Sequence, residues 1–254
     1  MLMKVEGIVK NFGGLIAVNE VNFHVNQGEI VGLIGPNGSG KTTLFNLLTG
    51  IANPDQGGIF FNDEKICGLP PHSIAQKGIG RTFQGTRVFP HLTVLENVMR
   101  GRHCRTTANL WSAILHTSYG RKELRESKKI AWQIIDGLGL GGKKNTPVAD
   151  LPYGLQAMTG IAIALASEPV LLLLDEPAAG MNPSETKELM VRIQEIRKKK
   201  ITIFMIEHNM KAIMGTCERI IVLNNGMKIA EGAPQEISQN EQVIQAYLGR
   251  GFLA

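Results

Sequence analysis

The sequence is poor in cysteine and aromatic residues, and it contains no long uninterrupted apolar run. Its three cysteines lie far apart and form no CxxC pair, so neither a disulfide framework nor a zinc site is indicated, and a reducing compartment is expected. Aromatic residues make up 6% of the chain, which argues against a stacking surface for single-stranded nucleic acid. The most apolar stretch, residues 161–174, is interrupted by polar residues and a proline, and it is shorter than the roughly 20 residues that cross a membrane.

The net charge of the chain is also small. The 27 basic and 22 acidic residues give a net charge of +5, whereas a dedicated nucleic-acid binder is usually more basic, so we expect no nucleic-acid partner. Charged residues interrupt the first ten positions, and we therefore expect no secretory signal there. With 254 residues, 43% of them hydrophobic, the chain can form one large domain or two small ones. Its 29 glycines indicate several backbone positions that require a positive φ or a close approach to a ligand, and loops that touch phosphate are one candidate.

Apolar runs predict the fold class. Residues 30–34 form an apolar run that ends at glycine, and residues 42–49 follow with apolar side chains at helical spacing, which predicts a strand, a glycine loop and a helix. Further runs at residues 170–174, 201–206 and 220–223 are typical of strands that are buried on both faces. The sequence therefore predicts an α/β core with a mainly parallel sheet.

Two other segments differ from this core. Residues 5–9 and 21–25 alternate between polar and apolar side chains, and residues 58–62 can extend the same sheet, so we expect an N-terminal antiparallel β subdomain. Between about residues 93 and 140 the pattern becomes helical and rich in charge. This change predicts a helical subdomain inserted into the α/β core.

The segment between the first core strand and its helix satisfies the pattern GxxxxGK[ST]. In such a loop, successive backbone N–H groups surround a β-phosphate, Lys41 supplies a cation between the β- and γ-phosphate oxygens, and the Thr42 hydroxyl can coordinate magnesium. A purely structural glycine turn is the alternative, but such a turn has no need of Lys-Thr after its last glycine. The candidate phosphate-binding residues are Gly35, Pro36, Asn37, Gly38, Ser39, Gly40, Lys41, Thr42 and Thr43.

The run at residues 170–174 is followed by two adjacent carboxylates. Asp175 is expected to hold magnesium, and Glu176 to polarise an attacking water molecule. A strand that merely ends in two solvated acids is the alternative, and the phosphate loop favours the catalytic interpretation. The sequence contains no NKxD guanine motif, so ATP rather than GTP is the expected nucleotide.

Two further polar residues are candidates for contacting the γ-phosphate. His208 follows the run at residues 201–206, and it is therefore expected at the same sheet edge as Asp175 and the phosphate loop. There it can hydrogen-bond a γ-phosphate, with a purely structural histidine as the alternative. Gln84 can ligate magnesium or sense the γ-phosphate through its amide.

These motifs, in this order over nearly the whole chain, resemble the nucleotide-binding subunit of an ATP-binding cassette (ABC) transporter. The resemblance implies one P-loop NTPase domain over residues 1–254, with ATP and Mg²⁺ as cofactors and hydrolysis coupled to transport across a membrane. Within it, approximately residues 1–92 and 151–254 are expected to form a RecA-like core with the β subdomain. Approximately residues 93–150 are expected to form the helical subdomain, which extends into the signature helix.

The same resemblance implies roles for single residues around the nucleotide. It assigns the Q-loop glutamine to Gln84, the catalytic glutamate to Glu176, the switch histidine to His208, the D-loop to residues 179–182, and the aromatic that stacks on adenine to Phe12. For Phe12, a place in the hydrophobic core is the alternative.

Residues 151–156 correspond to the LSGGQ signature of the family. By this resemblance, Gly154 and Gln156 face the nucleotide of an opposite subunit, so that ATP lies between two such domains. Pro152 stands where the signature usually has serine or alanine, and it offers neither an N–H nor a hydroxyl group to a phosphate. A glutamine and two arginines that are usual in this helix are replaced by Leu155, Met158 and Ile163. We therefore expect an intact site built on this chain's own catalytic residues, and a weaker mirror site completed by its signature.

Several segments look more closely like the ATPase of branched-chain (hydrophobic) amino-acid importers. They are GRTFQ at residues 80–84, LPYG at residues 151–154, DEPAAGMNP at residues 175–183, IEHNM at residues 206–210 and AYLG at residues 246–249. This likeness implies integral-membrane permease subunits, contacted through the groove around Gln84 and the helical subdomain, and a second ATPase subunit that is usually a different chain. It also implies an extracytoplasmic solute-binding protein, and a peripheral location on the cytoplasmic face of the inner or plasma membrane.

Other functions remain alternatives at this point. ATPases of urea or amide importers and of lipopolysaccharide exporters have similar sequences. A soluble ABC protein that acts on ribosomes or DNA is expected to carry two cassettes, a long coiled-coil insert or a strongly basic tail, and the sequence shows none of these. A nucleotide-binding scaffold without catalysis is disfavoured because Glu176 and His208 are retained.

Overall fold

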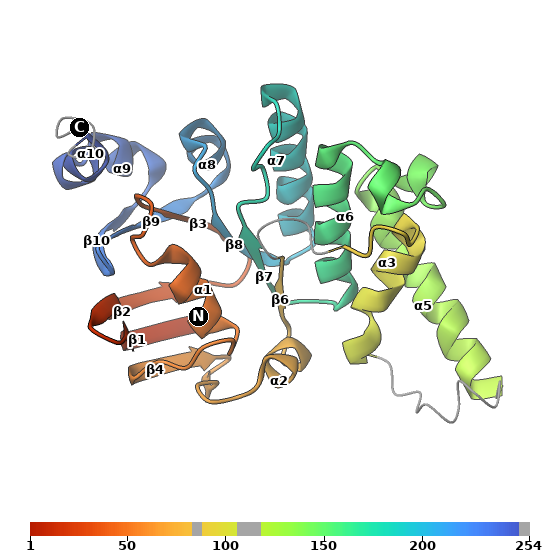
Figure 1. Cartoon of the computed structure of the whole chain (residues 1–254), viewed down its shortest axis with the longest axis horizontal. Coiled ribbons are helices and arrows are strands. Elements are labelled where there is room, and N and C mark those ends of the chain that lie inside the picture. The colour runs from red at the N-terminus through yellow and green to blue at the C-terminus, as the bar shows by residue number, and fades with distance from the viewer. Residues whose placement is uncertain (83–87, 106–117, 249–254) are drawn as a thin grey trace.

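A computed structural model describes residues 1–82, 88–105 and 118–248. Within these ranges the chain forms two sheets and the helices that cover them (Figure 1). The strands are β1 (Met3–Phe12), β2 (Leu15–Val25), β3 (Ile30–Ile34), β4 (Gln56–Phe61), β5 (Glu64–Lys65), β6 (Ile79–Arg81), β7 (Leu171–Asp175), β8 (Thr202–Ile206), β9 (Arg219–Asn224) and β10 (Met227–Gly232). The α-helices are α1 (Lys41–Leu48), α2 (Pro71–Gln76), α3 (Val94–Gly101), α5 (Ser118–Gly137), α6 (Tyr153–Ala166), α7 (Pro183–Lys198), α8 (Met210–Thr216), α9 (Pro234–Gln239) and α10 (Glu241–Leu248).

The central sheet has the strand order β10-β9-β3-β8-β7-β6. The strands from β9 to β6 are parallel, and β10 pairs antiparallel with β9. The four apolar runs predicted as buried strands are confirmed as β3, β7, β8 and β9. Because β3, β8 and β7 are neighbours, the segments that follow them meet at one edge of the sheet.

Alternate side chains of the central strands enter two separate cores. Val31 and Leu33 of β3 face a core formed with α1, α2 and the four-stranded sheet, whereas Ile30 and Ile34 face a core formed with helices that include α6, α7 and α8. On β8, Phe204 lies 5.5 Å from the ring of Phe23 and 5.2 Å from the ring of Phe45 (centroid to centroid), which joins β2 and α1 to the sheet. Strands covered on both faces in this way carry nearly continuous runs of apolar side chains.

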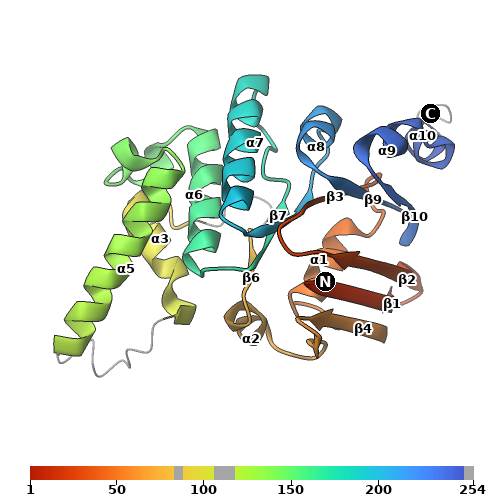
Figure 2. The same cartoon turned by 180° about the vertical axis from the view of Figure 1, so that it is seen from behind.

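The second sheet has the order β2-β1-β4-β5, with antiparallel pairing throughout. The predicted N-terminal antiparallel sheet is thus confirmed. Helices α3, α5 and α6 lie together at the opposite end of the molecule, and the view from behind shows the same grouping (Figures 1 and 2). The backbones of α3 and α6 approach closely at Gly101. A Cβ on this residue would lie 2.2 Å from the carbonyl oxygen of Ile163, so a larger side chain does not fit there. The predicted fold class, an α/β core with an antiparallel sheet and a helical insertion, is confirmed.

A helix that spans a membrane must be both long and predominantly apolar. No helix within residues 1–82, 88–105 and 118–248 is long and apolar enough to cross a membrane.

Candidate functional site

The glycine loop leaves β3 at Gly35 and enters α1 at Lys41, where its backbone runs against neighbouring chain segments. A Cβ on Gly35 would lie 2.1 Å from the carbonyl oxygen of Leu223, so only glycine fits there. Gly40 has a φ of +101°, and a Cβ on it would lie 2.4 Å from the carbonyl oxygen of Ala17. Both glycines are therefore required by close approach of backbone groups.

Lys41 is buried beneath this loop. Its ammonium Nζ donates hydrogen bonds to the carbonyl oxygens of Gly35 at 2.7 Å and Pro36 at 3.0 Å. Burial lowers the pKa of Lys41, and the nearby carboxylates of Glu176 and Asp175 oppose that shift. The loop thus holds a cation next to two acidic side chains before any phosphate is considered.

Asp175 ends β7 and is 3% exposed. Its Oδ2 accepts a hydrogen bond of 2.9 Å from the guanidinium of Arg81, in an ion pair whose side chains are almost fully buried. The same guanidinium donates to Oδ1 of Asn46 on α1 at 2.8 Å and to Oγ1 of Thr49, the C-cap of α1, at 3.0 Å. Arg81 therefore ties the end of β7 to the helix that follows the phosphate loop.

The two candidate catalytic residues touch each other. Glu176 Oε1 lies 2.8 Å from His208 Nε2, and this contact is a hydrogen bond when that nitrogen carries a proton. Glu176 adopts a φ of +49°, which is unusual for a residue other than glycine, and its N–H donates to the carbonyl oxygen of Ile206 at 3.0 Å. Backbone pairing with the β8 end thus holds Glu176 in a strained conformation of the kind that clusters at functional sites.

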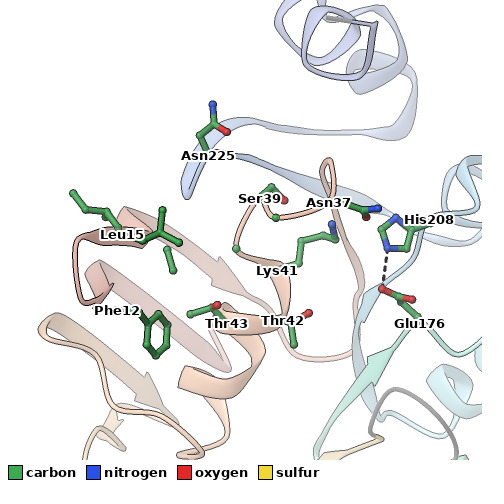
Figure 3. A pocket seen from close by; sticks show the side chains of 14 residues that line it. Phe12, Leu15, Asn37, Ser39, Lys41, Thr42, Thr43, Glu176, His208 and Asn225 are labelled. Carbon is green, nitrogen blue, oxygen red and sulfur yellow. Dashed lines mark hydrogen bonds and ion pairs between the residues drawn. The ribbon is translucent and has the colours of Figure 1, made fainter. Parts of the chain in front are cut away.

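A cavity of about 1140 Å³ opens over the phosphate loop. Figure 3 shows Phe12 and Leu15 at one end of it and Glu176 and His208 at the other, with Lys41 and Thr42 between them. Phe12 is 52% exposed, so the alternative of a core phenylalanine is wrong. The cavity has an apolar end and a polar end, and the lining residues predicted from the sequence are Phe12, Asn37, Gly38, Ser39, Gly40, Lys41, Thr42, Thr43, Glu176 and His208.

The remaining candidates lie elsewhere. Gly35 and Pro36 begin the loop but do not line the cavity, and their carbonyl groups accept hydrogen bonds from Lys41. Asp175 is buried and does not line the cavity either. Gly154 and Gln156 belong to α6 and are not among the residues that line the cavity, as expected if they serve an opposite subunit. The Gln156 amide donates to the carbonyl oxygen of Leu151 at 2.9 Å. Gln84 falls outside the described residues.

Sequence reasoning missed part of the cavity wall and two buried charged groups. Leu15, Ile16 and Ala17 enter the wall from β2, and only the register of the β1–β2 hairpin reveals this. Asn225 enters from the turn between β9 and β10, where the dipeptide Asn-Gly is a hairpin signal that could have been recognised. Arg81 and Glu207 stand inside motifs quoted above, yet their partners become evident only in three dimensions.

The donor groups fit a magnesium ion held together with phosphate. Asp175 Oδ1 is buried and has no hydrogen-bond partner among the residues that the structure describes, while Thr42 is exposed in the cavity wall. One hydroxyl and one carboxylate suit Mg²⁺, which takes few protein ligands and completes its shell with phosphate and water oxygens. Within residues 1–82, 88–105 and 118–248, no cluster of three or more His, Cys, Asp or Glu residues suits a metal held by protein alone.

Comparison with known proteins adds independent findings. A family model described as ABC transporter matches residues 18–179, and one described as branched-chain amino acid ATP-binding cassette transporter matches residues 227–252. The chain is 45% identical over 249 residues to the high-affinity branched-chain amino acid transport ATP-binding protein LivG of Escherichia coli, with 98% of both chains covered. It is 41% identical to the corresponding protein BraF of Pseudomonas aeruginosa, again over 98% of both chains.

A solved structure agrees with these matches. The crystal structure of the ADP conformation of MJ1267, an ATP-binding cassette of an ABC transporter, superposes with a TM-score of 0.86 and 31% identity, covering 98% of each chain. Because 98% of each chain is covered, the similarity includes both sheets, the phosphate loop and helices α3, α5 and α6.

Proposed function

Because this chain belongs to the ABC transporter family, we propose that it is the ATP-hydrolysing subunit that drives an importer of branched-chain or other hydrophobic amino acids. The observation that carries the proposal is the meeting of the phosphate loop, Glu176 and His208 in one cavity. The substrate class rests on relatives that share the full length of the chain and are named for branched-chain amino acid transport.

We propose that ATP lies along this cavity. The exposed ring of Phe12 suits stacking on adenine at the apolar end, and the backbone N–H groups of the loop suit the phosphates at the polar end. Lys41, whose positive charge is held in place by two carbonyl oxygens, compensates the charge of the β- and γ-phosphates. When bound, magnesium neutralises charge that develops on the phosphate oxygens, and Thr42, Asp175 and Gln84 are the residues proposed to hold it.

Hydrolysis then requires that water is aligned and that charge is stabilised. Glu176 is proposed to orient the attacking water molecule, and His208 to donate a hydrogen bond to the γ-phosphate. Their mutual contact of 2.8 Å supports a joint role, because each limits the position of the other. Phosphoryl transfer asks the protein mainly for such positioning and charge compensation.

We further propose that two ATPase subunits enclose the nucleotide between them. Gly154 and Gln156 at the N-terminal end of α6 would complete the site of the second subunit, which in this class is usually a different chain. Pro152 is the N-cap of that helix and makes no side-chain cap hydrogen bond. Since proline offers no N–H or hydroxyl group, the site completed by this signature is proposed to be the weaker of the two.

In the proposed transporter, the ATPase subunit must also contact the permease subunits in the membrane. We propose that permease helices dock on the helical subdomain, approximately residues 93–150 with the signature helix, and on the Q-loop around Gln84. Approximately residues 1–92 and 151–254 would form the nucleotide-binding core with the β subdomain. Such docking would hold the chain peripherally at the cytoplasmic face of the membrane, and a solute-binding protein outside would deliver the amino acid.

Reconstitution of the assembled transporter tests this function. The chain, its permease subunits, the second ATPase and the solute-binding protein are placed in vesicles, and uptake of labelled leucine is compared with uptake of urea and with lipopolysaccharide extraction. We expect ATP-dependent leucine uptake that Lys41→Ala abolishes, whereas Lys65→Ala on the short, exposed β5 leaves it unchanged. Uptake of urea alone, or lipopolysaccharide release without uptake, would overturn the amino-acid assignment.

A further inference from the structure

Glu207 is a buried carboxylate to which the mechanism above gives no task. It directly follows β8 and is 4% exposed. Its partners in the described part of the chain are three backbone N–H groups, with no cation among them. Burial raises the pKa of Glu207, and the N–H groups oppose that rise. Burying a carboxylate without a counter-ion lowers the stability of the folded chain, so the presence of Glu207 at this position calls for a reason other than stability.

The hydrogen bonds of Glu207 connect two segments at the sheet edge. Its Oε1 accepts a bond of 2.7 Å from the N–H of Ala178, in the turn that follows β7. Its Oε2 accepts bonds of 3.1 Å from the N–H of His208 and 3.5 Å from the N–H of Asn209. One carboxylate therefore fixes the turn after Glu176 to the segment that carries His208.

The same two segments meet again at the reacting groups. Glu176 Oε1 contacts His208 Nε2 at 2.8 Å, and Ala178 lies two residues beyond Glu176. Any shift of the turn relative to the β8 end would change this contact. On the proposed function, which this inference requires, we propose that Glu207 is a positioning residue that sets the placement of His208 relative to Glu176 and the D-loop turn.

The chemistry of the side chain explains why a carboxylate is needed. Both oxygens of a carboxylate accept hydrogen bonds, so donors from two segments are satisfied at once. In glutamine only one oxygen accepts, and the amide N–H groups oppose a backbone N–H on the other side. Glu207→Gln therefore keeps the size of the side chain and breaks the link to one of the two segments.

The test compares Glu207→Gln with the wild-type chain in the assembled ATPase complex. We expect kcat for ATP to fall roughly 10- to 100-fold while KM changes less than twofold, because misplacement of catalytic groups affects the reaction more than binding. In the labelled full-length chain, the imidazole NMR signal of His208, assigned with His208→Gln, should shift because the ring is displaced relative to Glu176. Glu231→Gln, an ion-paired carboxylate on β10 away from the cavity, is the matched control and should change neither readout.

The possible outcomes separate this inference from the proposed function. If ATP hydrolysis persists in both Glu207→Gln and Glu176→Gln, the proposed function itself fails. If Glu176→Gln abolishes hydrolysis but Glu207→Gln retains the wild-type kcat and His208 signal, the role of Glu207 alone is overturned.

A second variant covers the case in which the glutamine variant does not fold. Glu207→Asp keeps the charge and withdraws both oxygens by one methylene, and it should lower kcat in the same direction; a wild-type kcat would contradict the inference. In a His208→Ala background, Glu207→Gln should cause a much smaller further loss than it does alone, since its effect acts through His208. An equal loss in both backgrounds would show a merely structural role.

Discussion

At the scale of single residues, Arg81 determines how Asp175 is presented. Its guanidinium binds Oδ2 of the carboxylate. The other oxygen, Oδ1, is buried without a hydrogen-bond partner in the described part of the chain, and it is the oxygen proposed to bind magnesium. Charged groups with side chains 6% and 2% exposed tolerate the loss of a partner poorly, because the remaining charge cannot be hydrated. Arg81 thus stabilises the core and also determines which oxygen of Asp175 is left for the proposed magnesium ion.

Arg81→Met is expected to destabilise the chain strongly. Removal of one partner of a buried ion pair typically costs about 3–5 kcal/mol, and the hydrogen bonds to Asn46 and Thr49 are lost as well. Lys77→Met is the control, because the side chains of its ion pair with Glu64 are 35% and 67% exposed and the pair should therefore contribute little to stability. Urea unfolding of the three proteins measures the difference, and equal losses for both variants would refute the importance of burial.

The candidate site was predictable where a motif alone carries the chemistry. The phosphate loop and Glu176 were identified from spacing, and the cavity brings them together with His208. Arg81 and Glu207 were not assigned roles, because a charged residue next to a strand looks the same in sequence whether it is solvated or buried. Only the pairing of β6 with β7, and the turn that returns Ala178 towards β8, reveal their partners.

At the scale of secondary-structure elements, prediction succeeded for strands that are buried on both faces. Their continuous apolar runs set β3, β7, β8 and β9 apart from amphipathic helices. The edge strands β6 and β10 were missed for a physical reason. β6 has only three residues, which is too short for a hydrophobic pattern to be recognised. β10 is mostly half-buried and includes Lys228 and Glu231, so its apolar residues do not recur with a clear strand periodicity.

Helix α7 begins at a cap that explains Asn182, a position where aspartate is commoner. Its Oδ1 accepts hydrogen bonds from the N–H groups of Ser184 at 2.9 Å and Glu185 at 3.0 Å, and the Glu185 carboxylate accepts one from the Asn182 N–H. Asn182→Ala should therefore lower the free energy of unfolding by about 1 kcal/mol. Asn182→Asp keeps the cap and adds a negative charge at the helix N-terminus, so it should be at least as stable as the wild type.

Thermal unfolding of these variants checks the cap. Ser184→Ala in the same turn leaves both backbone donors in place and serves as the control. A stability of Asn182→Ala equal to that of Ser184→Ala would show that the cap contributes little to α7.

At the scale of the whole molecule, the central sheet separates two hydrophobic cores, and the candidate nucleotide cavity lies over the loop that follows β3 of this sheet. One core joins α1 and the antiparallel sheet to the central strands, and the other joins those strands to the helices on the opposite face. The phosphate loop and the ends of β7 and β8 lie where these parts meet, whereas Gly154 and Gln156 of α6 lie away from the cavity. This arrangement suits an assembly in which each subunit supplies only part of each ATP site.

The central claim is that this chain's own loop and acidic pair hydrolyse ATP, with a partner supplying the signature. In the assembled transporter, Glu176→Gln in this chain is compared with the equivalent substitution in the second ATPase, while ATP turnover and retained ATP are measured together. We expect Glu176→Gln to retain bound ATP and to lower turnover at least about 100-fold, consistent with removal of a general base, whereas the equivalent substitution in the second ATPase lowers turnover much less. Turnover that persists in Glu176→Gln, or equal losses from the two substitutions, would contradict it.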